Sequence, residues 1–462
     1  MFSIHYQGSR LCDGLTRREW LRVGGLSALG LSLPQLLQAR QNAAQGAYAP
    51  RSGRAKSCIL LLLLGGPPQH ETWDPKPDAP PEIRGDLKPI ATSLPGLLVG
   101  ELMPRTARLA HRLAVLRAVS TGDNAHSSSG YYMTTGRPHA PMGVENAKPG
   151  APNDWPCLGA LVKQVRGNRG GLPAAVTLPE KAANDGNLTW PGQDAGFLGR
   201  AADPWLLHCD PAAADFKVPE LSLPGEVPPL RLDQRATLLE QVNHHLAGPA
   251  TARYDAQNQQ ALDLLRSPRA REAFNLQREP PRLRDRYGRS TFGQSVLLAR
   301  RLVEAGVALV QVNWTRVPNA PNNGHWDTHT KNTEALKTAL MPRMDLAFST
   351  LLEDLAERGM LEETLVVVLG EFGRTPKINR AGGRDHWGSV FSIAMAGGGV
   401  RGGVVHGASD RIGAQPKDGL VRPPDITATI LHCLGHRPDA EIHDALGRPL
   451  PLSRGEVIRP IL

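Results

Sequence analysis

Four polar clusters rich in histidine and acidic residues follow apolar stretches of the sequence, at points where strands are expected to end. The clusters are Gln69–Asp74, Gly122–Ser129, His325–His329 and Gly370–Arg374, the last followed by Asp385 and His386. Histidine nitrogens and carboxylate oxygens bind divalent metals such as zinc, manganese and calcium. Because ligands bind beyond the carboxyl ends of the strands in an open parallel sheet, the four clusters together predict one metal-dependent site.

The third cluster could supply several ligands by itself. In an extended segment, side chains two residues apart point to the same side, so His325, Asp327 and His329 would share one face. A single histidine is more often a satisfied surface or core residue than a ligand. The metal hypothesis therefore depends on the clusters taken together.

Other polar residues in these clusters allow either a structural or a chemical role. The serine run that begins at Ser127 is typical of a helix N-cap, yet Ser127 is also the hydroxyl nearest to His126 in the sequence. Arg374 and Arg384 could each clamp an anionic oxygen of a substrate, or serve as structural arginines. The sequence leaves both interpretations open.

The elements that must position these clusters are strands and helices in alternation. Continuous apolar runs predict buried strands at 57–64, 113–119, 307–312, 365–369 and 390–396. Helical periodicity predicts helices at 102–114, 233–247, 253–278, 290–305, 332–358 and 424–434. This alternation predicts an α/β fold with a mostly parallel central sheet, flanked by helices on both faces.

Composition limits the classes of protein that fit. The 462 residues include 48 Gly and 40 Pro, which predicts many loops but falls short of the bias of a disordered or fibrous chain. Residues 140–232 are rich in Pro and Gly, and we expect long loops there with short elements, on the side of the sheet that carries the site. The net charge of +9 comes from scattered basic residues, so no nucleic-acid groove is expected.

The N-terminus has the anatomy of an export signal. Arg17 and Arg18 are followed by Leu21 and an apolar run, the pattern that the twin-arginine exporter recognises. We expect residues 1–45 to be this signal, residues 50–462 to be one domain, and the protein to reside in the periplasm or cell envelope. The apolar run is interrupted by serine and proline and is too short for a stable transmembrane span. Cleavage is expected between about 42 and 49, with an uncleaved anchor as the alternative.

The polar clusters resemble motifs of an exported family called domain of unknown function 1501, within the alkaline phosphatase and sulfatase superfamily. The motifs are Gly65-Gly66-Pro67-Pro68-Gln69 through Asp74-Pro75-Lys76, Trp326-Asp327-Thr328-His329, Gly370-Glu371-Phe372-Gly373-Arg374-Thr375-Pro376 and Gly383-Arg384-Asp385-His386-Trp387. The resemblance covers most of the chain after the signal. It implies an alkaline phosphatase-like fold that holds one or two divalent metals and acts on phosphate or sulfate esters.

The resemblance implies a set of metal ligands, carried over position by position. They are Glu71, His126, Asp327, His329, Glu371 and His386. Glu71 matches the acidic ligand after the first strand, and His386 resembles the last metal histidine. Asp327 and His329 resemble a later acid-and-histidine pair, although their spacing is shorter than the common one.

Three positions depart from the superfamily pattern. Glu371 stands where the superfamily usually has Asp, and Phe372 stands where it usually has a ligand His. His126 occupies the slot of the Cys or Ser nucleophile, at the usual distance before Thr135-Gly136-Arg137. Because the Cys that becomes formylglycine is absent, a standard sulfatase mechanism is not expected.

Three functions are compatible with these residues. The lead hypothesis is an exported metal-dependent hydrolase of anionic esters, such as a sulfated or phosphorylated saccharide. In it, His126 or Ser127 attacks, and Arg374 or Arg384 steadies the charge on the transferred group. The departures favour an alternative, a catalytically lapsed binding protein of the envelope whose acidic residues pair with Arg or Lys. A phosphomutase-like transferase is the third, and it requires a phosphorylated intermediate on Ser127 or His126.

Overall fold

The computed structural model describes residues 53–462, except 169, 185–187, 219–220, 222–233, 236, 240, 242–248 and 445. The predicted export signal and most of the predicted helix 233–247 lie outside the described residues. Within the described part of the chain, no helix combines the length and apolar character that crossing a membrane requires.

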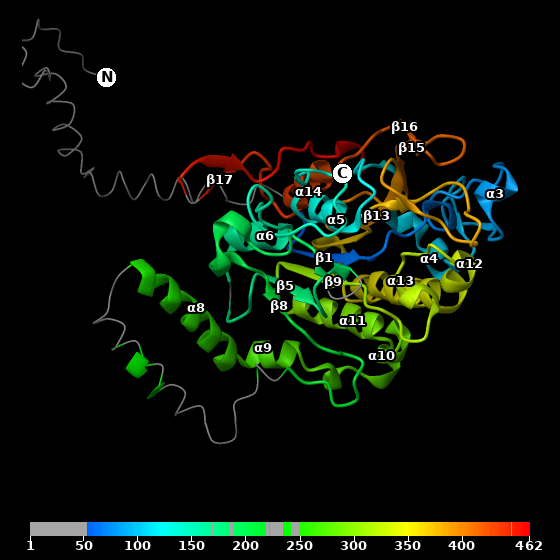
Figure 1. Ribbon diagram of the computed structural model, residues 1–462. Helices are drawn as coiled ribbons and strands as arrows, with labels where there is room; N and C mark the ends of the chain where they lie inside the picture. The colour runs from blue at the N-terminus through cyan, green and yellow to red at the C-terminus, as the bar shows by residue number, and fades with distance from the viewer. Residues whose placement is uncertain are drawn as a thin grey trace, which may run out of the picture. The chain divides into compact units, whose positions relative to one another are not determined.

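An eight-stranded sheet forms the centre of the domain (Figure 1). Its strands are β1 (Ser57–Leu62), β4 (Leu113–Val119), β5 (Ala175–Leu178), β8 (Trp205–Leu206), β9 (Leu309–Asn313), β10 (Thr364–Leu369), β13 (Phe391–Ala396) and β14 (Val404–His406). They lie in the order β14-β4-β13-β10-β1-β9-β5-β8. All neighbouring pairs are parallel except those of β13, which is antiparallel to β10 and β4. The predicted α/β fold with a mostly parallel sheet is confirmed.

The central strands are apolar because the sheet is covered on both faces. Every residue of β1, β9, β10 and β13 is buried, as expected for strands between two helical layers. Figure 1 shows α5 (His126–Thr135), α6 (Leu158–Arg166) and α14 (Pro423–Cys433) on one side of these strands. On the other side are α10 (Pro281–Tyr287), α11 (Thr291–Glu304) and α13 (Met341–Glu357).

The remaining elements are short or peripheral. The other α-helices of the described residues are α3 (Pro81–Arg84), α4 (Pro104–Arg108), α8 (Pro249–Arg266), α9 (Pro268–Ala273) and α12 (Asn332–Ala335). Two-stranded ribbons pair β2 (Pro89–Ala91) with β3 (Leu98–Gly100), β6 (Ala183–Asn184) with β7 (Leu188–Thr189), and β11 (Gly373–Arg374) with β12 (His386–Trp387). Two more pair β15 (Ala408–Ser409) with β16 (Pro416–Asp418), and β17 (Glu441–His443) with β18 (Pro449–Pro451).

Proline marks an irregularity in two helices that the sequence predicted to be continuous. Between α8 and α9, Pro268 starts a new helix whose N-cap is Ser267, which accepts a hydrogen bond from Ala270. Between α12 and α13, residues 336–340 form a π-helical turn just before Pro342. Proline has no N–H to continue the helical ladder and its ring clashes with the preceding turn. The helix predicted at 253–278 is therefore divided, whereas the one predicted at 332–358 is continuous, with a π-helical turn within it.

The Pro- and Gly-rich segment 140–232 contributes more to the sheet than its composition suggested. Besides the expected loops, it supplies helix α6 and strands β5 and β8, which extend the parallel sheet beyond β9. Strands of four and two residues are too short for a periodic pattern to reveal.

Candidate metal centre

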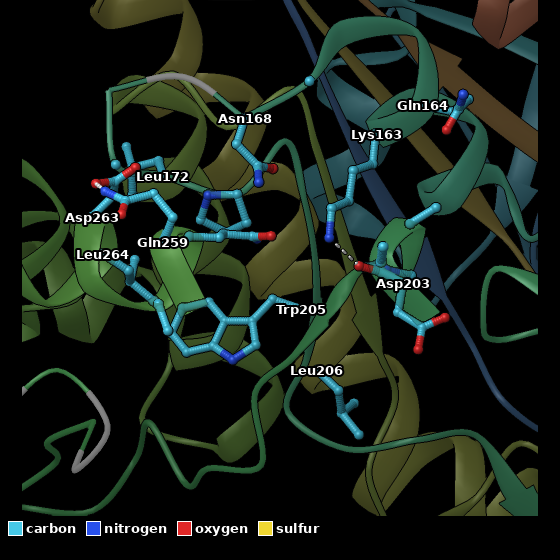
Figure 2. A pocket seen from close by; sticks show the side chains of 18 of the residues that line it. Lys163, Gln164, Asn168, Leu172, Asp203, Trp205, Leu206, Gln259, Asp263 and Leu264 are labelled. Atoms are coloured by element: carbon cyan, nitrogen blue, oxygen red, sulfur yellow. Dashed lines mark hydrogen bonds between the residues drawn. The ribbon is translucent and has the colours of Figure 1, made fainter. Parts of the chain in front are cut away.

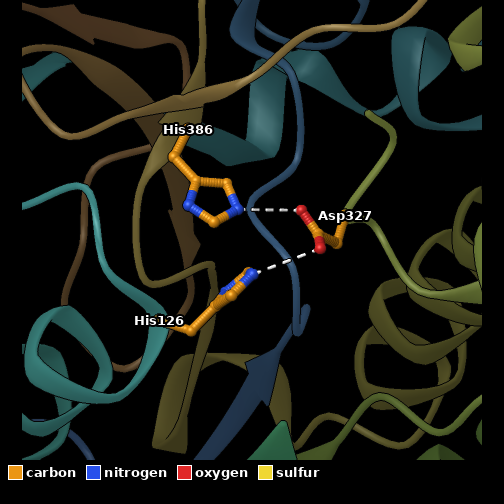
Figure 3. Close-up of side chains that lie close together, drawn as sticks. All are labelled: His126, Asp327 and His386. Carbon is orange, nitrogen blue, oxygen red and sulfur yellow. Dashed lines mark hydrogen bonds and ion pairs between the residues drawn. The ribbon is translucent and has the colours of Figure 1, made fainter. Parts of the chain in front are cut away.

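Three side chains from distant segments meet at the carboxyl ends of the parallel strands (Figure 3). They are His126, Asp327 and His386, and their ligand atoms lie within 4.8 Å of one another. His126 is the first residue of α5, which follows β4, and Asp327 lies in the loop after β9. His386 belongs to β12, shortly before β13. The group has the composition of a site that could hold a divalent metal ion.

The single antiparallel strand explains how His386 reaches this edge. Because β13 runs opposite to its neighbours, the residues before it lie at the same edge as the residues after β10. The two segments pair as the ribbon β11–β12, in which Arg374 is the partner of His386. One connection between two neighbouring strands therefore delivers two site residues.

His126 is held by a carboxylate on each side. Its Nδ1 lies 2.6 Å from Oε1 of Glu371, and its Nε2 lies 3.3 Å from Oδ2 of Asp327. Burial lowers the pKa of His126, but the hydrogen bonds and charges of the two carboxylates outweigh it and raise the pKa to about 9. In the absence of a metal ion the ring is therefore protonated at neutral pH, and a metal ion would replace the proton on the Asp327 side.

Asp327 is the meeting point of the group. Its Oδ1 lies 3.0 Å from Nε2 of His386 and 3.0 Å from Nε2 of His329, and it also accepts a hydrogen bond from Arg374. Burial alone would raise the pKa of Asp327. Hydrogen bonds from three histidines and the charge of the arginine hold the pKa well below its usual range, so the carboxylate is ionised.

His329 lies at the solvent side of the group. Its Nε2 is 3.0 Å from Nε2 of His386, and its Nδ1 is 2.7 Å from Oδ1 of Asp385. The hydrogen bond to Asp327 raises the pKa of His329. The segment around it is not the extended strand that we expected, because main-chain bonds join Thr328 to Trp326 and His329 to Asp327 in tight turns. Asp327 and His329 nevertheless converge.

Arg374 is completely buried, and its hydrogen bonds go to groups of the protein itself. Its guanidinium group donates to the carbonyl oxygens of Gly65, Gly66 and Arg384 as well as to Asp327. The guanidinium group thus makes four hydrogen bonds to protein groups and no part of it is exposed, which favours a structural role over a substrate clamp.

Glu71 lies apart from the group of three and forms a buried ion pair. Its Oε1 accepts two hydrogen bonds from Arg384, at 2.6 and 2.9 Å, and neither residue is appreciably exposed. Arg384 also donates to the carbonyl oxygens of Ile83 and Thr375. The pair thus joins the segment after β1 to the segment that carries His386, and the structure does not bring Glu71 to the other predicted ligands.

The Ser127 hydroxyl is bonded to main-chain groups of the segment 144–147. It donates to the main-chain carbonyl of Glu145 and accepts from the N–H of Ala147. Ser129 similarly donates to the carbonyl of Glu371, at 2.6 Å. The serine run therefore fixes the start of α5 against two loops, and Ser127 is not positioned as a nucleophile.

The turn after β1 is built around two glycines. Gly65 and Gly66 have φ of +111° and +79°, a region that favours glycine. A Cβ on Gly65 would lie 2.3 Å from the main-chain nitrogen of Asp327, and one on Gly66 would lie 2.6 Å from the ring of Phe372. The main-chain N–H of Gly65 also donates to Oε1 of Glu371, at 2.8 Å. Close backbone approach therefore sets the position of both carboxylates.

A cavity of about 380 Å³ opens in front of the group. Its lining residues are Gly65, His126, Glu145, Asn146, Ala183, Asn184, Leu188, Trp190, His325, Asp327 and His386. Glu145 accepts the main-chain N–H of His126 at 2.8 Å, and Asn184 donates to Glu145. Trp190 stacks on the His126 ring, with centroids 5.9 Å apart. Glu145, Asn184 and Trp190 belong to no motif recognised in the sequence, so the sequence analysis did not predict them as site residues.

One buried oxygen supports the fit of a cation. Oε2 of Glu371 is buried and has no hydrogen-bond partner among the described residues, although its Oε1 has two. A buried carboxylate oxygen without a partner is costly unless a positive charge lies close to it. The unsatisfied oxygen on the residue that holds His126 is therefore consistent with a bound metal ion.

Fold and site together define an α/β protein with a histidine–carboxylate group at the carboxyl edge of its sheet. The chain belongs to the family described as protein of unknown function DUF1501, whose model matches residues 55–462. A search of curated proteins finds no match.

Solved structures of similar arrangement match this chain at low sequence identity. The phosphonate monoester hydrolase SpPMH from Silicibacter pomeroyi has 11% identity and a TM-score of 0.40, covering 87% of this chain and 76% of that one. The sulfatase PsFucS1 from Pseudoalteromonas sp. has 14% identity and a TM-score of 0.38, with coverages of 88% and 72%. A Vibrio parahaemolyticus protein of the alkaline phosphatase superfamily has 12% identity and a TM-score of 0.38, with coverages of 86% and 75%. TM-scores of this size do not carry an activity over to this chain.

His70, in the first polar cluster, has a structural position. It is buried, and its Nε2 donates to the carbonyl oxygen of Ile412 at 2.8 Å, while Nδ1 has no partner among the described residues. Burial, together with the positive charges of Arg384 and Lys76, lowers the pKa of His70 to about 3. The folded protein therefore keeps this ring neutral.

The lowered pKa predicts a loss of stability in acid. Below about pH 6.5, His70 is protonated in the unfolded chain but stays neutral in the folded protein. Its contribution to the free energy of unfolding is therefore fully present above this pH and is lost as the pH decreases toward 3. The loss should be about 1.4 kcal/mol per pH unit. The free energy of unfolding, measured with urea at several pH values between 4 and 6.5, should depend less steeply on pH by this amount in His70→Gln. His443→Gln, at an exposed site, should keep the wild-type slope, and equal slopes in all three proteins would contradict the assignment.

Proposed function

We propose that this protein is an exported metal-dependent hydrolase of phosphate or sulfate esters. The observation that carries the proposal is the group of His126, Asp327 and His386 beside a cavity, with Asp327 held ionised. Two imidazoles and one carboxylate suit zinc or manganese better than calcium, which prefers oxygen ligands. A bound metal ion would supply a Lewis acid and lower the pKa of a coordinated water.

The protein's own residues would prepare the site for this chemistry. Glu371 holds Nδ1 of His126, so its Nε2 is directed at Asp327 and the cavity. Arg374 donates a hydrogen bond to the Asp327 carboxylate and so holds it in place, which means that this ligand need not reorient during the reaction. Asp385 holds Nδ1 of His329, whose Nε2 lies 3.0 Å from His386 and could hold a proton for the leaving oxygen.

The attacking group in this proposal is water. The described residues that line the cavity include no serine, threonine or cysteine, and the Ser127 hydroxyl is engaged elsewhere. A covalent intermediate on Ser127 is therefore disfavoured, and a phosphomutase-like transferase would have to form its phosphorylated intermediate on His126, which lines the cavity.

Metal analysis and ester hydrolysis test the proposal together. Purified protein should hold about one zinc or manganese ion per chain and hydrolyse 4-nitrophenyl phosphate, bis(4-nitrophenyl) phosphate or 4-nitrophenyl sulfate. His126→Ala and Asp327→Asn should lose the metal, as read by elemental analysis, and lower kcat/KM by roughly a hundredfold or more. His443→Ala should match the wild type in both measurements. Wild-type protein that neither retains added metal nor cleaves any of these esters would refute the proposal.

A non-catalytic binding protein is the second candidate, and two contacts favour it. Glu71 is paired with Arg384 and Asp327 with Arg374, which is what a member of the fold that had lost its metals would show. Metal bound at His126 and Asp327 without hydrolysis of any ester would favour this function over the first.

Glu371 should tune the metal affinity of the site. It binds the ring of His126, and partners that hold a ligand histidine typically contribute 10- to 100-fold to metal affinity. We expect Glu371→Gln to weaken binding of zinc by about this factor, as measured with a competing chelator. Glu145→Gln is the matched control, because Glu145 contacts the main-chain N–H of His126 and not its ring. Equal losses in the two variants would contradict the assignment.

Export rests on the sequence alone. Arg17 and Arg18 lie outside the described residues, and the twin-arginine pattern around them is the reason to propose transport to the periplasm or cell envelope. Replacing both with lysine should leave the protein inside the cell, with its signal uncleaved, as seen by fractionation and mass spectrometry of the intact chain. Unchanged distribution would refute the route.

A further inference from the structure

Two adjoining cavities lie at the edge of the sheet opposite to the metal centre. Both are lined by the loop that joins α6 to β5, and they share Gly167, Gly170, Leu172 and Pro173. Their volumes are about 850 and 740 Å³, each larger than the cavity of about 380 Å³ at the metal centre. The second cavity reaches the first residues of β1 and β10, which places it at the amino ends of these strands.

The first cavity combines an aromatic ring with uncharged polar groups (Figure 2). Trp205, on the edge strand β8, is partly exposed and lines this cavity together with Leu264 of α8. The carboxamide side chains in the lining are Gln164, Asn168, Gln259 and Gln260. An aromatic ring packs against the C–H face of a sugar, and carboxamides both donate to and accept from hydroxyl groups. This lining fits neutral sugar residues.

The charges of the first cavity argue against a nucleic acid. Asp203 and Asp263 supply two carboxylates, whereas Lys163 supplies one ammonium group, which already donates to the carbonyl oxygen of Asp203. A phosphodiester backbone needs a continuous track of cations along its path. A saccharide with widely spaced charges has no such requirement.

The second cavity is basic. Its lining contains the cations Lys56, Arg166, Arg269 and Arg358 and the carboxylates Glu304 and Glu363. Lys56 pairs with Glu363 at 2.7 Å, and Arg358 pairs with Glu304 at 3.1 Å. Arg269 is exposed, and its guanidinium group lies 3.3 Å from where a Cβ of Gly306 would be. The formal excess of positive charge fits one or a few anionic groups.

We propose that the two cavities bind an acidic oligosaccharide, with neutral sugar rings against Trp205 and a carboxylate or sulfate group beside Arg269. The strands that separate these cavities from the metal centre are about six residues, or about 20 Å, long. A saccharide segment bound in these cavities therefore lies too far from His126 to react at the metal centre of the protein molecule that binds it. The cavities tether the protein to an acidic polysaccharide, and this role does not depend on the hydrolase proposal.

Binding of a defined oligosaccharide to the purified protein tests the inference. A hyaluronan octasaccharide alternates neutral and carboxylate sugars, and isothermal titration should detect its binding. A neutral dextran oligosaccharide, oligoglutamate and single-stranded DNA of similar length should bind more weakly. Equal or tighter binding of any of these three, or no binding of the octasaccharide, would overturn the proposal.

Variants locate the site within the two cavities. Trp205→Ala and Arg269→Glu should each raise Kd for the octasaccharide about tenfold or more, because each removes a central contact. Trp205→Phe should recover part of the affinity, and Arg282→Glu, at an exposed arginine outside the lining, should match the wild type. The midpoint of thermal unfolding identifies any variant that fails to fold. Folded Trp205→Ala and Arg269→Glu proteins that bind as tightly as the wild type would overturn the proposal.

Discussion

The buried guanidinium group of Arg374 connects the segments that form the metal centre. It donates to the carbonyl oxygens of the turn after β1, to the carbonyl oxygen of Arg384 and to the carboxylate of Asp327. An arginine can do this because it presents five donors in one rigid plane. A buried charge of this kind is tolerated only when its donors are satisfied and a counter-charge is present. Asp327 provides that charge. The contact that makes the burial of Arg374 tolerable therefore also fixes the position of Asp327 in the metal centre.

A second buried arginine extends the same arrangement away from the cavity. Arg384 neutralises Glu71 and fixes the strand that carries His386. Both arginines of the conspicuous Gly-Glu-Phe-Gly-Arg and Gly-Arg-Asp-His motifs are therefore occupied by protein groups. The cavity itself receives histidines and carboxylates, and an anionic substrate would have to find its positive charge in a metal ion and in protonated imidazole.

The sequence was sufficient for much of the fold, because buried parallel strands leave continuous apolar runs. The strand 113–119 was predicted at its observed bounds, and 365–369 differs from β10 by one residue. The direction of β13 could not be predicted, since an antiparallel strand buried on both faces has the same composition as a parallel one. The strands β5 and β8 were missed because they are short and flanked by Pro and Gly.

The candidate site was predictable as a set of clusters but not as a set of roles. Residue type and position after a strand pointed to His126, Asp327 and His386, which the structure brings together. The same reasoning could not separate Glu71 from them, because a carboxylate that binds a metal and one that binds an arginine look alike in sequence. Only tertiary contacts decide between the two, and Arg384 lies more than three hundred residues from Glu71 along the chain.

The antiparallel direction of β13 also affects how the centre could change over evolution. Parallel neighbours must be joined by a crossover that returns the chain to the opposite edge of the sheet. The connection from β10 to β13 begins and ends at one edge, so it needs no crossover helix. Its tip is bonded to the loop after β9, where the N–H groups of Lys331 and Asn332 donate to the carbonyl oxygens of Ala381 and Gly382. A change in the length of this connection would therefore move the loop that carries Asp327 and His329, although no strand of the central sheet need shift its register.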